Sequence, residues 1–568
     1  MANENMSPED FINAPTTVAL VLPSVSVTKA FLENHMDILF SKPLTGGYII
    51  AYVNENDVDK VVTNAVNYST HIYPVVLGLL GADYLASAGI LQVHRQPFLT
   101  LRGSGVLLGF ISTGIDYRQK TFQYEDGTSK IQYIWDQSIR GNPPADYHYG
   151  SEYNNETINR ALKSENPLEV VPHADTVGHG TFLASVAGGR EMDGHIGAAP
   201  DAEIIAVKLK RARPLDYARY LIPRHQENAF SSDDFILGVQ YIIDKAIELK
   251  RPVAICVSLG TNQGGHDGFN ILEEYLAKVS NIQGTAVCAA AGNEANAGHH
   301  TQGRIAATGA SEDIEVRISD KQEDVYLTVW NYASDRMSVS VKSPTGEQVS
   351  RIPARSGVIS RTKLVLERST VIVDYIFPIE TSGGQVSRVR ILSATPGIWT
   401  ITVYGDSILD GTFHSWLPIV GFIDPDTRFI SPKPNYTIVL PATSLGVITC
   451  GAYNSKDNSL YDASSWGPTR LPAIKPDLTA PGVDVSGISS IGPGTMSGTS
   501  VSAAITAGAC ALMLQWGVVE QHLVPMNSYR VRAKLIAGCD RNPGVEYPNY
   551  QWGYGRLNLL RTFQAMRS

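Results

Sequence analysis

Residues 498–504 read GTSVSAA and place Ser500 at the start of a long run of small residues. The run to about Gln515 predicts a helix. The first turn of a helix leaves backbone N–H groups unpaired at the positive end of the helix dipole. This place favours a nucleophilic hydroxyl and stabilises the oxyanion that it forms. The alternative is that Ser500 only caps the helix.

Two further segments place polar residues at the ends of predicted elements. In GHGT (residues 178–181), His179 stands between glycines at the start of a helix, free of crowding. In AAGNE (residues 290–294), Asn293 follows a predicted buried strand, and such positions face the crevice where α/β sheets bind ligands. The Asn293 amide is therefore a candidate donor to a developing oxyanion. Taken singly, both residues are also consistent with structural roles.

Apolar runs of strand length alternate with amphipathic helices around these segments, which is the pattern of a doubly wound parallel α/β sheet. Strands are predicted at residues 106–111, 204–209, 253–259 and 285–290, and helices at 233–249 and near 270–279. The pattern breaks near Ser311. From there to about residue 435, strand-like segments and turn signals such as SPTG and TPG predict an all-β insert, a sandwich or jelly roll.

Residues 14 to about 80 predict a small ferredoxin-like unit ahead of the α/β region. Its strands are predicted at residues 17–22, 47–53 and 71–79, and its helices at 27–34 and 57–65. The predicted organisation has four parts: the ferredoxin-like unit, a first α/β segment, the all-β insert and a second α/β segment, at residues 1–80, 81–310, 311–435 and 436–568.

The charge balance and the cysteines narrow the class of protein. The chain has 46 Lys and Arg against 55 Asp and Glu, a net charge of −9. Nucleic acid and anionic membranes bind preferentially to a basic patch, so we expect neither as a partner.

The five cysteines show no C-x-x-C spacing, and Cys256, Cys288 and Cys510 have small apolar neighbours. We expect buried free thiols, which suit a reducing compartment.

Targeting signals are not evident in the sequence. The N-terminus, MANENMSPEDF, has neither the basic start nor the apolar core of a signal peptide. No apolar run approaches the roughly 20 residues of a membrane helix. We therefore expect a protein without a signal peptide or membrane span, in the cytoplasm.

Together, the three polar segments resemble the motifs of the subtilisin-like serine proteases, the subtilases or S8 family, whose Asp, His and Ser follow in that chain order. Further segments resemble the family at residues 196–208, 477–482 and 553–558. The resemblance spans about residues 85–310 and 436–568 and implies a subtilisin-like fold. It implies an endopeptidase that acts on proteins or peptides without a cofactor. Structural calcium is common in the family, but no contiguous ligand loop indicates it here.

The resemblance also implies the role of each site residue. Ser500 would attack the scissile carbonyl, and His179 would take its proton and pass it to the leaving amine. Asn293 and the Ser500 backbone N–H would hold the oxyanion. The segment Ser258, Leu259 and Gly260 would pair with the substrate backbone. His299-His300 is expected to be a solvated loop pair rather than a metal site.

The N-terminal unit resembles the family's propeptide, which assists folding and then occupies the active site. The resemblance implies self-processing between about Tyr73 and Ser87. The order of propeptide, α/β segment, all-β insert and α/β segment is similar to that of the Csp proteases of clostridial spore germination. That narrower resemblance implies activation of a cortex-lytic zymogen and a spore-associated location.

One position departs from the family. Subtilases end the first strand with D-S/T-G-I-D, whereas this chain reads STGID at residues 112–116. Ser112 occupies the slot of the aspartate that fixes the His tautomer and stabilises the imidazolium. In subtilisin, loss of that aspartate costs about 3 × 10⁴-fold in kcat. Asp116 and Asp175 are nearby acids, and a structural role is expected for both. Two interpretations stay open: a slow endopeptidase, and a pseudoprotease that binds or regulates a partner.

Overall fold

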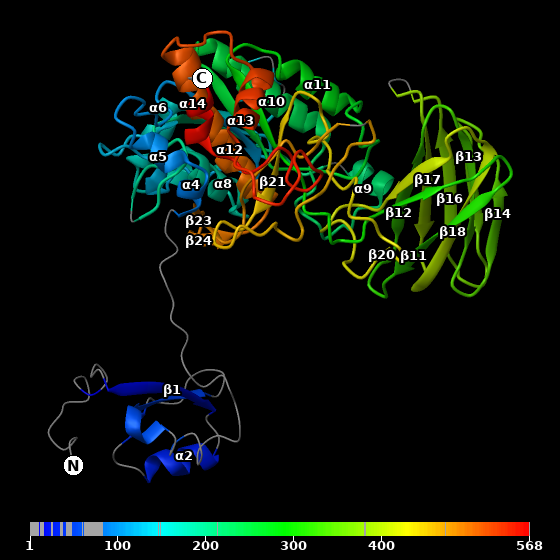
Figure 1. Cartoon of the computed structure of the whole chain (residues 1–568), viewed down its shortest axis with the longest axis horizontal. Helices are drawn as coiled ribbons and strands as arrows, with labels where there is room; N and C mark the ends of the chain where they lie inside the picture. The colour runs from blue at the N-terminus through cyan, green and yellow to red at the C-terminus, as the bar shows by residue number, and fades with distance from the viewer. Residues whose placement is uncertain are drawn as a thin grey trace. The chain divides into compact units, whose positions relative to one another are not determined.

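The computed structural model describes residues 83–566 except 146, 148, 193, 213, 380–381 and 472. Before them it describes residues 11, 16–23, 26–34, 38–40, 48–58 and 61. The chain forms two compact units, Met1–Leu79 and Leu80–Ser568. Figure 1 shows both.

The core of the second unit is an eight-stranded sheet of order β22-β21-β9-β8-β4-β7-β5-β6. All of its neighbouring strands are parallel except β5 and β6. The predicted parallel sheet is thus confirmed. Its strands are β4 (Leu107–Ser112), β5 (Ile131–Asp136), β6 (Ser151–Asn154), β7 (Glu203–Lys208), β8 (Val253–Val257), β9 (Thr285–Ala290), β21 (Ile448–Tyr453) and β22 (Leu478–Pro481).

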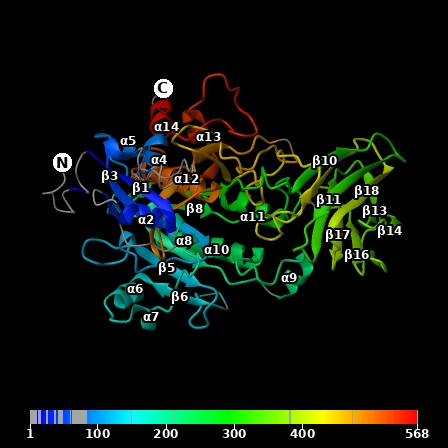
Figure 2. The same ribbon diagram turned by 90° about the horizontal axis from the view of Figure 1, so that it is seen from below.

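Helices cover both faces of this sheet (Figure 2). One face packs in a single apolar core with α4 (Asp83–Ser87), α5 (Ile90–His94), α6 (Asn155–Leu162), α8 (His179–Gly188), α12 (Thr499–Leu514), α13 (Ser528–Gly538) and α14 (Leu559–Ala565). The other face packs with α10 (Ser232–Glu248) and α11 (Ile271–Val279). Shorter elements are α7 (Pro167–Val170), α9 (Pro214–Tyr220), η2 (Lys120–Phe122), η3 (Gln515–Val519) and the hairpin β23 (Val485–Ser489) and β24 (Gly492–Met496).

Helix α12 is buried in the apolar core that it shares with α8 on one face of the sheet. Together with η3 it covers Thr499–Val519, 21 residues that contain an 18-residue window with a mean hydropathy of 1.5. Among the described residues it is the one helix long and apolar enough to cross a membrane, which the sequence analysis did not anticipate. In this fold 89% of that window is buried, as in the core helix of a globular domain.

The all-β insert is a sandwich of two antiparallel sheets, of order β10-β19-β12-β17-β16-β15 and β14-β13-β18-β11-β20. One apolar core lies between them. The sandwich starts at β10, before the predicted boundary at Ser311, because β10 pairs with β19. Its strands are β10 (His300–Arg304), β11 (Ser311–Ile318), β12 (Val325–Asn331), β13 (Arg336–Lys342), β14 (Gln348–Ile352), β15 (Ile359–Lys363), β16 (Thr370–Ile376), β17 (Gln385–Leu392), β18 (Gly397–Ser407), β19 (Thr412–Trp416) and β20 (Arg428–Phe429).

Buried aromatic rings join the sandwich to the α/β core. His266 follows β8 and stacks on Trp416 of β19 at 4.2 Å, and His300 lies 5.0 Å from the same indole. Burial lowers the pKa of His266 to about 4 and that of His300 to about 3. The prediction that His299-His300 is a solvated pair is wrong, since both side chains are buried. The described residues contain no group of three His, Cys, Asp or Glu placed to hold a metal.

All five cysteines are free and buried, as predicted.

The first unit has a sheet of order β1-β3-β2 with antiparallel pairing. Its described elements are β1 (Thr17–Pro23), α2 (Ser26–Glu33), β2 (Leu39–Phe40), β3 (Tyr48–Asn54) and η1 (Glu55–Asp57). Two predicted strands and the first predicted helix match β1, β3 and α2. The strand predicted at residues 71–79 and most of the helix predicted at 57–65 lie outside the described residues.

We predict that Gly508→Ala destabilises the protein. Alanine normally favours a helix over glycine. At Gly508 of α12, however, an added Cβ would lie 2.4 Å from the Ala198 Cβ and 3.0 Å from the Ala187 carbonyl oxygen. Such overpacking costs about 1–3 kcal/mol, so the thermal midpoint should fall. Gly494→Ala is the control, because an added Cβ meets nothing within 4 Å there. Equal midpoints for the two variants would contradict the close packing of α12.

Candidate active site

The site forms where three parallel strands end. Ser112 closes β4, Ser258 follows β8, and Asn293 comes shortly after β9. Because β4, β8 and β9 are neighbours in the parallel sheet, their carboxyl ends meet at one edge. Helices α8 and α12 begin near this edge and carry His179 at the first position and Ser500 at the second.

Ser112 hydrogen-bonds to His179. Its Oγ lies 3.0 Å from the His179 Nδ1, and its side chain is only 2% exposed. For Nε2 to act as a base, Nδ1 must carry the proton and donate it to this hydroxyl. The Ser112 hydroxyl can accept this hydrogen bond but supplies no negative charge. Burial lowers the pKa of the His179 imidazole, although the carboxylate of Asp175 partly opposes this.

The two nearby acids have structural partners. Asp116 accepts hydrogen bonds from the Arg118 guanidinium at 2.7 and 3.1 Å and from the Gln119 amide at 3.1 Å. Asp175 caps the start of α8, where it accepts from the backbone N–H groups of Gly178 and Thr181 at 2.8 and 2.9 Å. Both carboxylates are therefore engaged away from the imidazole, as expected for structural residues.

A glycine allows α8 to approach β4 closely. A Cβ added at Gly180 would lie 2.1 Å from the Gly114 carbonyl oxygen and 3.2 Å from the Ser112 Cβ. The residue after His179 must therefore lack a side chain. The GHGT segment positions the imidazole through this contact and through the Asp175 cap.

Ser500 and Asn293 are held on the opposite side of the site. The half-buried Ser500 Oγ donates to the Ser258 carbonyl at 3.2 Å, so attack on a substrate requires the hydroxyl to turn toward His179. The Asn293 Oδ1 accepts from the Thr499 backbone N–H at 3.1 Å and from the Thr499 hydroxyl at 3.2 Å. These contacts fix the amide and leave its Nδ2 to donate at the mouth of α12.

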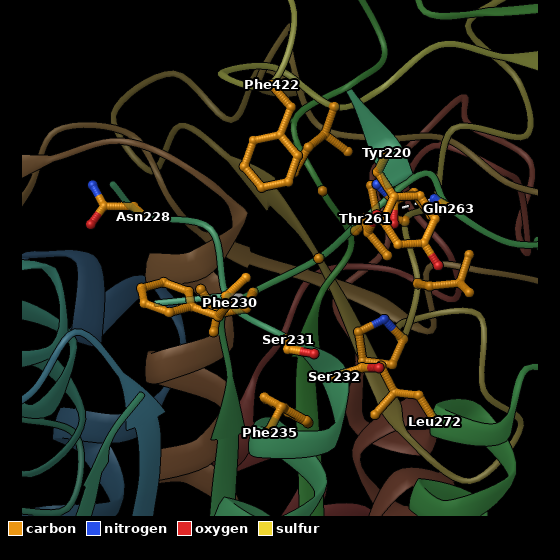
Figure 3. Close-up of a pocket in the computed structure, with 18 of the residues that line it drawn as sticks. Tyr220, Asn228, Phe230, Ser231, Ser232, Phe235, Thr261, Gln263, Leu272 and Phe422 are labelled. Carbon is orange, nitrogen blue, oxygen red and sulfur yellow. Dashed lines mark hydrogen bonds between the residues drawn. The ribbon is translucent and has the colours of Figure 1, made fainter. Parts of the chain in front are cut away.

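Part of this arrangement lines a cleft of about 720 Å³. Ser500, Asn293 and the segment from Ser258 through Leu259 to Gly260 contribute to its lining. Figure 3 shows the aromatic part of the wall, where Tyr220, Phe230, Phe235 and Phe422 surround the pocket.

Phe422 lies in the segment between β19 and β20 of the sandwich, and Tyr220 ends α9. Sequence reasoning missed both contributions. No motif marks them, because only the three-dimensional fold brings Phe422 of the insert and Tyr220 of α9 to the same cleft.

Comparisons with known proteins agree with this geometry. The model of the subtilase family matches residues 103–351 and 427–555, more than half of the chain. The solved structure of the Clostridium perfringens CspB protease matches with 32% identity and a TM-score of 0.76, over 86% of this chain and 99% of that chain.

A subtilisin-like protease of Arabidopsis thaliana, SBT6.1, is 30% identical over 139 residues, which is 23% of this chain. That match spans only 13% of the plant protein's length. The family match covers both α/β segments and includes His179, Asn293 and Ser500 in the order that the sequence motifs indicated. The chain therefore belongs to the subtilase family of serine-type peptidases.

Proposed function

We propose that this chain is a serine endopeptidase that cleaves its own N-terminal unit and a protein substrate, at a rate limited by Ser112. The observation that carries the proposal is the hydrogen bond of 3.0 Å between Ser112 and His179, at the sheet edge where Ser500 and Asn293 line a cleft. The Ser112 hydroxyl can accept from Nδ1–H in the productive tautomer of the base, but it brings no charge.

The residues would act as follows. The Ser500 hydroxyl leaves the Ser258 carbonyl, attacks the scissile carbonyl and passes its proton to the His179 Nε2. The Asn293 Nδ2 and the Ser500 backbone N–H receive the oxyanion. The imidazolium then protonates the leaving amine. During both steps the Ser112 hydroxyl accepts from Nδ1–H, but it does not balance the positive charge, so the barrier rises.

The N-terminal unit supports the self-processing part of the proposal. Met1–Leu79 forms a compact unit of its own, in the place where the family carries a propeptide that occupies the active site. Cleavage is proposed between Tyr73 and Ser87. The similarity to the Clostridium perfringens CspB protease supports a protein substrate. We extend the proposal to activation of a zymogen in spore germination, by an enzyme that is cytoplasmic or spore-associated and needs no cofactor.

The alternative is a pseudoprotease that binds or regulates a partner. Ser112 favours it, because an uncharged residue stands where the family has an acid. The presence of His179, Asn293 and Ser500 together in the family motifs favours the enzyme. The two functions differ in one measurable respect, since a pseudoprotease has no cleavage that depends on Ser500.

We expect the purified wild-type protein to lose its N-terminal unit and the Ser500→Ala variant to keep it. Denatured intact mass, recorded for both proteins after identical incubation, checks this. A processed wild type beside a full-length variant identifies Ser500 as a working nucleophile and gives the cleavage site. If both proteins stay full length, self-processing is absent and the pseudoprotease is preferred.

Restoring the acid should raise the rate. Ser112→Asp places a carboxylate beside the His179 Nδ1, and we expect kcat to rise by up to about 10⁴-fold. Ser112→Asn is the matched control, because asparagine has nearly the size of aspartate but carries no charge. Measured on one peptide substrate, a gain for Asn equal to that for Asp would show that shape, and not charge, limits the wild type.

The acidic limb of the pH profile should also move. His179 acts as a base in its neutral form, and burial lowers its pKa below the ordinary value of about 6.5. Wild-type kcat/KM should therefore persist below that pH. Ser112→Asp stabilises the imidazolium, raises the pKa and moves the limb to higher pH. Profiles of kcat/KM measured between about pH 4 and 9 would contradict this if the acidic limb of the wild type lay at higher pH than that of the variant.

A further inference from the structure

One sheet of the all-β insert ends in an exposed strand. Strand β15 is the last strand of the six-stranded sheet and pairs with β16 on one side. At the end of this ladder, the Leu364 N–H donates to the Ser369 carbonyl at 2.9 Å. Bonded and non-bonded pairs alternate along an antiparallel ladder, so the N–H and C=O groups of Ile359, Arg361 and Lys363 point away from β16. They form an open edge to which another strand can pair.

This edge is basic, although the chain as a whole is acidic. Residues 351–370 include five basic residues and one acid, whereas the net charge of the chain is −9. The acid, Glu367, is buried and accepts from the Thr345 N–H and hydroxyl at 3.0 and 2.6 Å. Arg361 and Lys363 are exposed, and neither has an ion-pair partner in the part of the chain that the structure describes.

The neighbouring strands add positive charge to the same face of the sheet. The register places Arg390 of β17 in line with Arg361, across β16. Asp374 of β16 accepts from Arg388 at 2.7 Å and from Arg390 at 2.9 Å. The face therefore has four basic side chains around one carboxylate that is already paired. A strand added to β15 would place every second side chain on this face, opposite Arg361 and Lys363.

Apolar side chains lie at both ends of the edge. Val365 and Leu366 follow β15 and are 75% and 76% exposed, and Ile359 at the start of the strand is 66% exposed. The Glu347 carboxylate accepts from the N–H groups of Val365 and Leu366 at 2.7 and 2.9 Å. These bonds fix the turn in place. Docking onto a turn that is already ordered loses little conformational entropy.

The charges determine which occupant fits this edge. A second copy of the chain, paired β15 to β15, would set basic side chains against basic side chains, which is destabilising. Nucleic acid and anionic lipid would neutralise the charge but would leave the backbone groups of the edge unpaired. An extended peptide with acidic side chains at alternate positions meets both requirements, since strand addition uses main-chain bonds for affinity and side chains for specificity.

We propose that β15 and the turn at Val365 and Leu366 bind an extended acidic segment of a partner protein, which adds to the six-stranded sheet as a further strand. None of the residues of β15 lines the cleft that contains Ser500. Binding at this edge is therefore expected of an enzyme and of a pseudoprotease alike.

The test uses the full-length Ser500→Ala protein, so that the probe stays intact, and a fluorescein-labelled peptide of sequence Val-Thr-Glu-Thr-Glu-Thr-Val. Fluorescence anisotropy should show saturable binding, at least about tenfold tighter than that of the same peptide with Lys in place of Glu. Two further probes have alternate peptide nitrogens methylated, one probe for each register. One of them should bind at least about tenfold more weakly, because its N–H groups cannot pair with β15.

Two variants at one position separate charge from backbone. Arg361→Ala removes one charge and should weaken binding several-fold. Arg361→Pro also removes an N–H that points away from β16, a place where an edge strand tolerates proline, and should weaken binding several-fold further. Lys433→Ala changes an exposed lysine outside β15 and should leave the affinity unchanged. If Arg361→Pro lowers the thermal midpoint, the methylated probes alone decide the backbone part.

The outcomes that overturn the proposal are distinct. No binding of the acidic peptide at concentrations up to about 1 mM removes the site. Equal affinity for the acidic peptide and both methylated probes shows that the edge does not pair. A DNA duplex or phosphatidylglycerol vesicles that bind more tightly than the peptide, with a loss of binding in Arg361→Ala, would assign the face to an anionic polymer or a membrane instead of a protein.

Discussion

The parallel pairing of β4, β8 and β9 is the constraint on which the site depends. Each strand ends at the same edge of the sheet, so Ser112, Ser258 and Asn293 meet although up to 181 residues separate them in sequence. The buried helix α12 then brings Ser500 to that edge, and α8 brings His179. Disturbance of the sheet register would separate all of these groups at once.

The position of Ser112 shows how geometry and charge can be separated in a catalytic site. The hydroxyl occupies the hydrogen-bonding place beside Nδ1, and Gly180 and Asp175 position the imidazole independently of it. The fold therefore keeps the base in place without the acid. What is lost is electrostatic stabilisation of the imidazolium, which packing and hydrogen bonds from neutral groups do not replace.

Much of the α/β fold could be predicted from the sequence, because strands buried on both faces have continuous apolar runs. Thr285–Ala290 was predicted to the residue, and His179, Asn293 and Ser500 stand at element ends in short motifs. The strands of the insert were harder to predict. Strand β10 carries His300 and few apolar residues, so it gave no strand signal. The burial of His299 and His300 depends on partners such as Glu294 and His414, and local sequence does not encode such contacts.

The insert is therefore more than an appended domain. It leaves the α/β core at β10, and Leu417 and Val420, which lie between β19 and β20, bond to His299 and Glu294, within six positions of Asn293. The stacked rings of His266 and Trp416 secure the same junction. Buried His266 and His300 are kept neutral, so they contribute packing and neutral hydrogen bonds to this junction. Through Val420 and Glu294, the sandwich is thus bonded directly to the residue that follows Asn293.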